Sequence, residues 1–215
     1  IIPIEMCHIE GKNVILNNQS KPHFIRKKGE NFQAKQILFY SGEVLTPEKI
    51  SLCAAAGVEK LSVYRKMNIA VISTGDELKN LGTKLAFGEI YESNSYGISA
   101  LIQACGHNAN RFPLVVDDID KLREVLDSAI KSNDLVITSG GVSMGTHDYV
   151  RILMEKEGKI KFWRIKIRPG SPPIFGFWKG TPIFGLPGNP VSSHVVFRVL
   201  VAPFLLNLTK TNSPN

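Results

Sequence analysis

The chain has 215 residues, of which 43% are hydrophobic and 21% charged, so it is long and apolar enough to bury a core without disulfide bonds. Its three cysteines form no C-x-x-C pair and its five histidines lack ligand spacing, which argues against a zinc site. The net charge of +7 comes from scattered lysines and arginines without an aromatic-interleaved RNA motif, so a solvated basic face or an anionic small molecule is favoured over nucleic acid.

The first residues, Ile1 to Glu5, lack the basic and apolar regions of a signal peptide, and isoleucine in place of methionine indicates a fragment of a longer protein. Unpaired, widely separated cysteines are typical of a reducing compartment. The apolar runs are shorter than the roughly 20 residues that a membrane span needs. We therefore expect a cytoplasmic protein without a membrane partner.

Residues 1–66 are expected to form a smaller, β-rich or mixed segment, the remnant of an N-terminal domain or linker. Thr46-Pro47-Glu48 predicts a helix start with proline at the first helical position, and this helix should run to Ala56 and stop at Gly57. Extended apolar runs predict short strands over residues 13–16, 36–40 and 58–64.

From Asn68 onward, buried-strand patterns alternate with helical patterns. This alternation indicates an α/β fold, a mostly parallel sheet with helices on both faces, over a domain of residues 67–210, with a terminal tail at 211–215. The expected strands are residues 68–73, 108–116, 134–139, 160–167, 173–178 and 182–185. The expected helices are residues 95–105, 119–131, 148–157 and 190–208.

The last of these helices contains an apolar stretch from Val195 to Leu206. We expect a core helix that is kinked at Pro203, since the stretch is too short and too interrupted by Arg198 to span a bilayer.

Two loops at the carboxyl ends of expected strands are suited to an anion. Ser73 to Leu78 combines hydroxyl donors with Gly75, although a polar turn with a helix cap gives the same pattern. Ser139 to Gly145 places adjacent glycines before a helix, which predicts a phosphate cradle, with a flexible turn as the alternative. It is neither a Walker A motif nor a G-x-G-x-x-G fingerprint.

Carboxylates occur in the same loop layer. Asp118 is expected to cap the helix that starts at Ile119, which leaves Asp117 free to face the loops. Asp148 stands before another helix and could join Asp117 in holding Mg²⁺, or could simply interact with the helix dipole.

Basic residues and a rigid turn complete the candidate site. Strand alternation over 160–167 and beyond predicts Arg164, Lys166 and Arg168 on one face, which suits an oxyanion, although a solvated edge strand gives the same pattern. The Pro187-Gly188-Asn189-Pro190 turn before a long helix offers backbone N–H groups and the Ser192 hydroxyl.

Five motifs, in this order, resemble the MoeA family of molybdopterin molybdenumtransferases and the gephyrin E domain, and the similarity runs over essentially the whole chain. They are TGDEL (Thr74–Leu78), Asp117-Asp118, SGGVSMG (Ser139–Gly145) followed by Asp148-Tyr149, RPGSPP (Arg168–Pro173) and GLPGNPVS (Gly185–Ser192).

The resemblance implies a molybdopterin-binding domain that inserts molybdate into adenylylated molybdopterin with Mg²⁺, releasing AMP and molybdenum cofactor. It implies that Asp117, Asp148 and Glu77 are catalytic, and that Asp117 and Asp148 bind the metal. It also implies a homodimer and contact with the adenylyltransferase of the pathway. The implied substrate-binding residues are Thr74, Gly75, Asp76, Ser139, Gly140, Gly141, Ser143, Gly145, Arg164, Arg168, Pro187, Gly188, Asn189, Pro190 and Ser192.

The chain departs from the family pattern at Asn31, where relatives typically carry aspartate, and at Ser171, where many carry lysine. The family's N-terminal part and C-terminal β domain are also expected to be missing. Two other functions therefore stay open. One is a molybdopterin adenylyltransferase, whose glycine loop normally reads TGGTG, and the other is a pterin-binding or scaffold module without turnover.

Overall fold

The computed structural model describes residues 2–17, 19, 25–143, 145 and 148–208, so the expected tail at 211–215 lies outside the described residues. The chain divides into two compact units, Ile1–Ser41 and Gly42–Asn215. The domain boundary expected near residue 66 remains a prediction, because compactness does not show which part folds independently.

The first unit contains a small hairpin. A 3-10 turn, η1 (Ile4–Met6), leads into strand β1 (Cys7–Glu10), which pairs antiparallel with β2 (Asn13–Leu16). The strand expected over 13–16 is thus confirmed. The strand expected over 36–40 is wrong, because these residues pair with no strand among the described residues, and a strand needs partners for its N–H and C=O groups.

In the second unit, helix α1 (Pro47–Ala55) begins as predicted. The Thr46 hydroxyl accepts a hydrogen bond from the Lys49 N–H at 3.4 Å, and proline occupies the first helical position. The strand expected over 58–64 is wrong, because these residues are all exposed and join no ladder.

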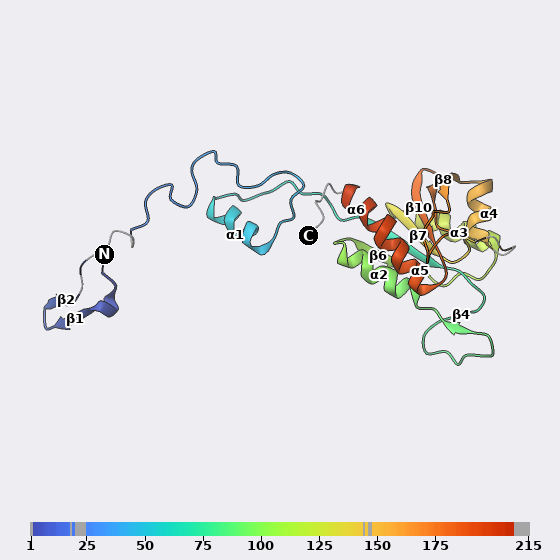
Figure 1. The fold of residues 1–215 in the computed structure, drawn as a ribbon, viewed down its shortest axis with the longest axis horizontal. Helices are drawn as coiled ribbons and strands as arrows, with labels where there is room; N and C mark the ends of the chain where they lie inside the picture. Colours follow the sequence, from blue (N-terminus) through green and yellow to red (C-terminus); the bar gives the residue numbers. More distant parts are fainter. Residues whose placement is uncertain (1, 18, 20–24, 144, 146–147, 209–215) are drawn as a thin grey trace. The chain divides into compact units, whose positions relative to one another are not determined.

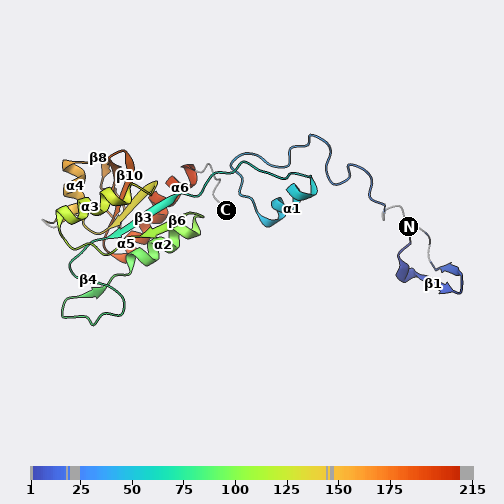
Figure 2. The same ribbon diagram turned by 180° about the vertical axis from the view of Figure 1, so that it is seen from behind.

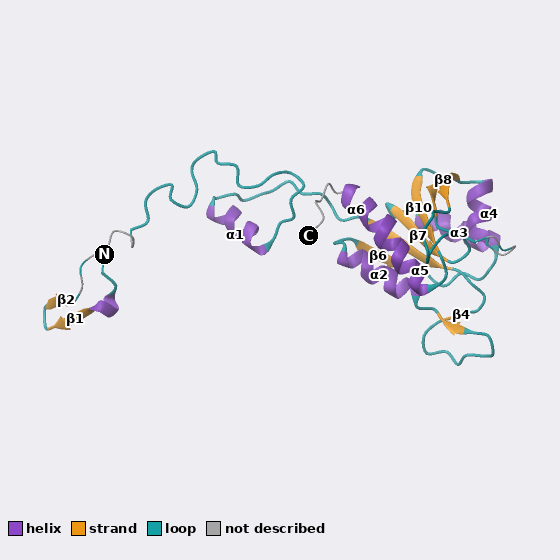
Figure 3. Cartoon of the chain, in the orientation of Figure 1, coloured by secondary structure: helices purple, strands orange, loops and turns teal. Residues whose placement is uncertain are grey.

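A six-stranded sheet with the order β6-β3-β7-β10-β9-β8 forms the centre of the second unit (Figures 1 and 3). The first four strands in this order pair in parallel, while β9 and β8 extend the sheet antiparallel. The predicted α/β fold with a mostly parallel sheet is confirmed. The strands are β3 (Asn68–Ser73), β6 (Asn108–Arg111), β7 (Leu135–Ser139), β8 (Lys159–Trp163), β9 (Ile174–Trp178) and β10 (Thr181–Leu186).

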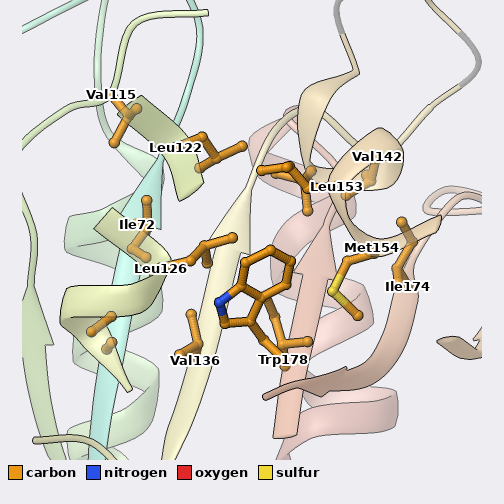
Figure 4. Packing of buried hydrophobic residues seen from close by; sticks show 14 residues of the cluster. Ile72, Val115, Leu122, Leu126, Val136, Val142, Leu153, Met154, Ile174 and Trp178 are labelled. Atoms are coloured by element: carbon orange, nitrogen blue, oxygen red, sulfur yellow. The ribbon is translucent and has the colours of Figure 1, made fainter. Parts of the chain in front are cut away.

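Helices cover both faces of this sheet, as Figures 1 and 2 show from opposite sides. On one face lie α3 (Ile119–Ala129) and α4 (Tyr149–Lys156), whose leucines surround the fully buried Trp178 (Figure 4). On the other lie α2 (Asn94–Ala104), α5 (Pro190–Val196) and α6 (Ala202–Leu208). Both faces of β3 and β7 are buried, which is why these strands are continuous apolar runs.

Two strands are shorter than expected. The strand predicted over 108–116 ends at Arg111, because Pro113 has no N–H for the ladder, and only Val115 returns to form a bridge with Thr74. The strand predicted over 160–167 ends at Trp163, because Arg164 adopts a left-handed backbone conformation with φ 69°.

The last helix follows the predicted span, but a π-helical turn, η3 (Phe197–Val201), stands in place of a kink centred on Pro203. A proline removes the N–H that would bond four residues back, and a wider turn accommodates that loss. Contrary to our expectation, the helix Pro190–Leu208 is long and apolar enough to cross a membrane by length and composition, with a mean hydropathy of 1.6. Core helices pass the same test, and this helix packs its inner side onto the sheet.

Between β3 and α2, two short strands pair in parallel, β4 (Leu78–Lys79) and β5 (Ile90–Tyr91). They close the base of a loop that extends from the sheet edge (Figure 1).

Candidate functional site

The parallel topology brings the predicted motifs to one edge of the sheet, where ligands bind in α/β folds. Thr74 follows the end of β3, Gly140 the end of β7 and Pro187 the end of β10. Backbone hydrogen bonds join these ends: the Thr74 N–H donates to the Ser139 carbonyl at 3.1 Å, and the Gly140 N–H donates to the Leu186 carbonyl at 3.1 Å.

An acidic corner lies at the end of β3. The Thr74 hydroxyl, in a residue only 5% exposed, donates to Asp117 Oδ1 at 2.9 Å. The Asp117 N–H in turn donates to Asp76 Oδ1 at 2.9 Å. Thr74, Asp76 and Asp117, all candidates from sequence, therefore form one hydrogen-bonded group.

Asp118 has the separate role expected for it. Its carboxylate accepts hydrogen bonds from the backbone N–H groups of Asp120 at 2.9 Å and Lys121 at 3.0 Å, and so caps α3. The bond from Lys121 is the main reason that the pKa of Asp118 lies below its ordinary value, with the bond from Asp120 adding to it.

The glycine loop after β7 presses directly on the end of β3. Gly140 has φ 96°, and a Cβ there would lie 2.5 Å from the Thr74 carbonyl oxygen, so only glycine fits. The Gly140 N–H is already bound to Leu186, whereas the Gly141 N–H has no hydrogen-bond acceptor among the residues that the structure describes. Gly141 is thus the member of the pair available to an anion.

The turn after β10 contacts this loop. A Cβ on Gly188 would lie 3.7 Å from Gly140 Cα. Asn189 Oδ1 accepts from the Ser192 N–H at 3.1 Å and caps α5, where Pro190 holds the first helical position. The Ser193 hydroxyl donates to the Pro187 carbonyl. The loop that begins at Gly140 and Gly141 and the turn Pro187-Gly188-Asn189-Pro190 are called the two glycine turns below. They form one continuous surface.

Asp148 lies beyond the glycine loop, before the first turn of α4. Its carboxylate accepts a hydrogen bond from the Gly145 N–H, and the Arg151 N–H ties the same helix to the Gly141 carbonyl at 3.0 Å. Within the described part of the chain no hydrogen bond links Asp148 to Asp117. The structure thus places both acids around the glycine loop without joining them.

The described residues contain no cluster of three or more His, Cys, Asp or Glu side chains arranged to hold a metal. Asp117 and Asp148 each have one carboxylate oxygen that makes no hydrogen bond to another described residue. Mg²⁺ is commonly held by one or two carboxylates together with substrate phosphates. Each acid therefore offers one oxygen of the kind that Mg²⁺ binds, and the described carboxylates do not form a closed cage.

Glu77 is exposed and folds back over the turn, since a Cβ on Gly75 would lie 2.7 Å from Glu77 Oε2. The Ser143 and Gly145 side of the glycine loop is also exposed, while Met144, Thr146 and His147 lie outside the described residues.

The basic segment differs from the prediction. Arg164, Lys166 and Arg168 do not share one face of a strand, because β8 ends at Trp163 and the chain then bends. All three are nevertheless exposed and alternate with half-buried isoleucines. The segment runs toward the start of α5, where a Cβ on Gly170 would lie 3.4 Å from the Ser192 carbonyl oxygen. The three basic side chains are therefore exposed because they lie in a loop, and not because they alternate along a strand.

Sequence reasoning missed Glu92 and Asn94. Glu92 is only 6% exposed, and its carboxylate accepts from the Ser95 N–H at 2.7 Å, the Ser95 hydroxyl at 2.6 Å and the Ser73 hydroxyl at 2.9 Å. The Asn94 side chain reaches both glycine turns. A Glu-Ser-Asn-Ser run before an apolar helix was the available signal, since such residues cap helices.

An open, mainly apolar hollow of ≈ 390 Å³ lies beside this edge at the start of the last helix. It contains none of the carboxylates, and of the site candidates only Pro190 lines it. Its other lining residues are Val191, His194, Val195 and Arg198.

Comparison with known proteins gives consistent matches. The family described as "Probable molybdopterin binding domain" matches residues 70–207. The chain is 37% identical to a molybdopterin molybdenumtransferase of Haemophilus influenzae, over 86% of this chain and 46% of that protein. It is 35% identical to the molybdopterin molybdenumtransferase of a Nostoc species, over 97% of this chain and 49% of that protein. The chain spans about half the length of these relatives.

Among solved structures, the molybdopterin biosynthesis moeA protein from Pyrococcus horikosii superimposes with a TM-score of 0.78 at 32% identity, covering 97% of this chain and 52% of that one. The molybdenum cofactor biosynthesis protein B superimposes with a TM-score of 0.51 at 14% identity, over 67% of this chain and 94% of that one. The second match shows a shared fold alone.

Proposed function

Since the chain belongs to the molybdopterin-binding domain family, we propose that it is the pterin-binding part of a molybdopterin molybdenumtransferase, which inserts molybdate into adenylylated molybdopterin and releases AMP. The observation that carries the proposal is the contact between two glycine turns at the carboxyl edge of the sheet, beside the Thr74-bound carboxylate of Asp117. This arrangement offers donors for phosphates next to an acid.

The glycine turns would bind the phosphates of the substrate. Gly141 contributes a backbone N–H without an acceptor among the described residues, and Gly188 of the neighbouring turn borders the adjacent Gly140. The helices that begin at Tyr149 and Pro190 follow these turns, so the positive ends of their dipoles favour a negative ligand.

Asp117 and Asp148 would act on the anhydride bond between the pterin phosphate and AMP. The Thr74 hydroxyl orients one oxygen of Asp117 and leaves the other for a water molecule or a metal. Mg²⁺ bound by these acids would neutralise charge on the phosphates. Glu77 is exposed at the same edge and would complete the acidic group.

Molybdate would approach from the basic segment. Arg164 and Arg168 are exposed, and the segment that carries them packs near Ser192 at the start of α5. Guanidinium groups bind oxyanions with paired N–H donors. We further propose a cytoplasmic homodimer that receives its substrate from the adenylyltransferase of the pathway.

The test is AMP release from adenylylated molybdopterin by the complete gene product, with and without molybdate. We expect release to depend on molybdate and to fall at least about a hundredfold in Asp117→Asn and in Asp148→Asn, the range expected when a positioned acid or base is lost. Asp118→Asn is the matched control, because asparagine also caps a helix and the residue lies outside the proposed catalytic group.

The alternatives predict other outcomes. Pterin binding without AMP release would replace the transferase by a binding or scaffold module. Turnover of ATP with free molybdopterin would indicate an adenylyltransferase, and salt-sensitive binding to generic DNA or RNA would indicate a nucleic-acid module.

A further inference from the structure

One side chain joins the two glycine turns. Asn94, at the first position of α2, donates from Nδ2 to the Ser139 hydroxyl oxygen at 2.7 Å and to the Gly188 carbonyl at 2.7 Å. Ser139 ends β7 directly before the Gly140-Gly141 pair, and Gly188 lies in the turn after β10. A single amide therefore spans both phosphate-binding turns.

The chemistry of this contact requires an amide nitrogen. The Gly188 carbonyl can only accept, so the –NH₂ group must face it, and its second hydrogen is then available for Ser139. The opposite atom, Asn94 Oδ1, is buried and makes no hydrogen bond to another described residue, so both bonds of this side chain run through its nitrogen.

The backbone that carries Asn94 is fixed to the sheet. The buried Glu92 carboxylate binds the Ser95 N–H at the start of α2 and the Ser73 hydroxyl at the end of β3. The first turn of α2 is therefore held at the sheet edge, and the Asn94 side chain acts as a spacer of constant length between that edge and the turns.

We propose that Asn94 is a positioning residue that sets the separation of the two glycine turns, and so the placement of their N–H groups against the phosphates of the substrate. The identity of that substrate rests on the proposed function, whereas the link between the turns does not.

The first test compares Asn94→Ala with Gln103→Ala, which removes an exposed amide from the far end of the same helix. In the complete gene product, we expect Asn94→Ala to raise the KM for adenylylated molybdopterin about thirtyfold, the factor for two ordinary hydrogen bonds, with a much smaller change in kcat. Gln103→Ala should match the wild type. A KM for Asn94→Ala within about twofold of the control would overturn the proposal.

Asn94→Asp keeps the assay informative if the alanine variant folds poorly. Aspartate has nearly the same shape, and a negative charge in the first helical turn favours α2. It nevertheless presents only acceptors to the Gly188 carbonyl, so its KM should rise at least as much as that of Asn94→Ala. A KM near the wild-type value would contradict a role for the donor group.

Amide hydrogen exchange separates this proposal from the proposed function, since it needs no substrate. The Gly140 N–H, which donates to Leu186, should exchange at least about tenfold faster in both Asn94 variants, while the buried Ile183 N–H of β10 stays unchanged. Unchanged exchange at Gly140 would overturn the positioning role even if the wild type binds the pterin. Faster exchange in a protein that binds no adenylylated pterin would support the link and contradict the proposed function.

Discussion

Gly140 stands where the turn after β7 meets the backbone of β3. Its φ of 96° already disfavours other residues, and a Cβ would lie 2.5 Å from the Thr74 carbonyl oxygen, which is backbone and cannot rotate away. We expect Gly140→Ala to destabilise the fold by roughly 2–4 kcal/mol, the sum of left-handed strain and overpacking. Chemical denaturation measures this change.

Gly106 provides the matched control for that substitution. Its φ of 84° is also left-handed, but a Cβ there would meet no atom within 4 Å. Gly106→Ala should therefore cost only about 1 kcal/mol, the strain alone. Equal losses in the two variants would show that Gly140 is required for its conformation and not for the contact with β3.

We expect the stability of the fold to depend on pH through His107. The residue is 7% exposed, and its Nδ1 accepts a hydrogen bond from the Met67 N–H at 3.3 Å, which requires the neutral ring. Burial, and secondly the charge of Lys66, lower the pKa of His107. The neutral ring of His107 therefore stabilises the folded state. Because the pKa of His107 is lower in the folded state, this contribution is complete above the unfolded-state pKa of about 6.5, and it is lost as the pH falls toward the folded-state pKa.

His107→Asn isolates this effect, since its Oδ1 can replace Nδ1 as acceptor but does not titrate. Thermal denaturation between pH 8 and pH 5 should show a steeper loss of stability for the wild type than for His107→Asn. Parallel curves for the two proteins would assign the acid sensitivity to other groups.

At the residue scale, sequence identified the side chains in and beside the glycine turns, but it missed Asn94, whose hydrogen-bond partners are far away along the chain. The Ser93-Asn94-Ser95 run is typical of a helix cap, yet Ser93 makes no capping hydrogen bond and Asn94 bonds to residues 45 and 94 positions away. Local periodicity carries no information about such partners. Asp118, whose partners are two and three residues away, was correctly predicted as a cap.

At the scale of elements, one tether links α3 to the turn between β9 and β10. The Asp127 carboxylate accepts from Trp178 Nε1 at 2.8 Å and pairs with Lys179 Nζ at 2.7 Å. Trp178 is fully buried, so Asp127→Ala leaves its N–H unpaired and should cost about 1–3 kcal/mol, whereas Asp127→Asn keeps an acceptor and should cost less.

Urea denaturation of both Asp127 variants at neutral pH measures the two losses in the free energy of unfolding.

The hydrogen bond to Lys179, followed by that to Trp178, lowers the pKa of Asp127. The tether therefore stabilises the fold above the unfolded pKa, and this contribution is lost as the pH falls through the folded one. If Asp127→Asn were as unstable as Asp127→Ala, the lysine pair and not the indole bond would dominate.

The elements that sequence predicted well are the strands buried on both faces and the most clearly amphipathic helix. The continuous apolar runs of β3 and β7 could only be central strands, and the amphipathic pattern of α3 could only be a surface helix. Residues 36–40 and 58–64 carry similar side chains but have no partner strand within the described part of the chain, and β8 ends early because of the backbone at Arg164. Pairing and backbone geometry are decided by tertiary context, which side-chain patterns do not contain.

At the scale of the whole molecule, the site follows from topology more than from any one motif. Four parallel strands place the ends of β3, β7 and β10 side by side. Three loops that are far apart in sequence therefore meet at one edge of the sheet, and the α/β pattern alone predicts this. The mutual placement of Asp117 and Asp148 could not be predicted in this way, because it depends on the course of a loop between Gly141 and Asp148.

The same topology predicts where an independent domain begins. Both hydrophobic clusters are built from residues between Met67 and Leu205, although the compact unit starts at Gly42. Across the expected boundary, Arg65 pairs with Asp134 at 2.5 Å, but the Arg65 side chain is 72% exposed, and such pairs contribute little in water.

A chain of residues 67–215 should therefore unfold cooperatively, with a melting temperature within about 3 °C of that of residues 42–215, a difference well below the effect of losing a core contact. Calorimetry of the two chains measures it. If 42–215 melts cooperatively and 67–215 does not, residues 42–66 are part of the folding unit and the boundary at 66 is wrong. Equal melting temperatures would assign the stability of the sheet, and of the site at its edge, to residues after 66.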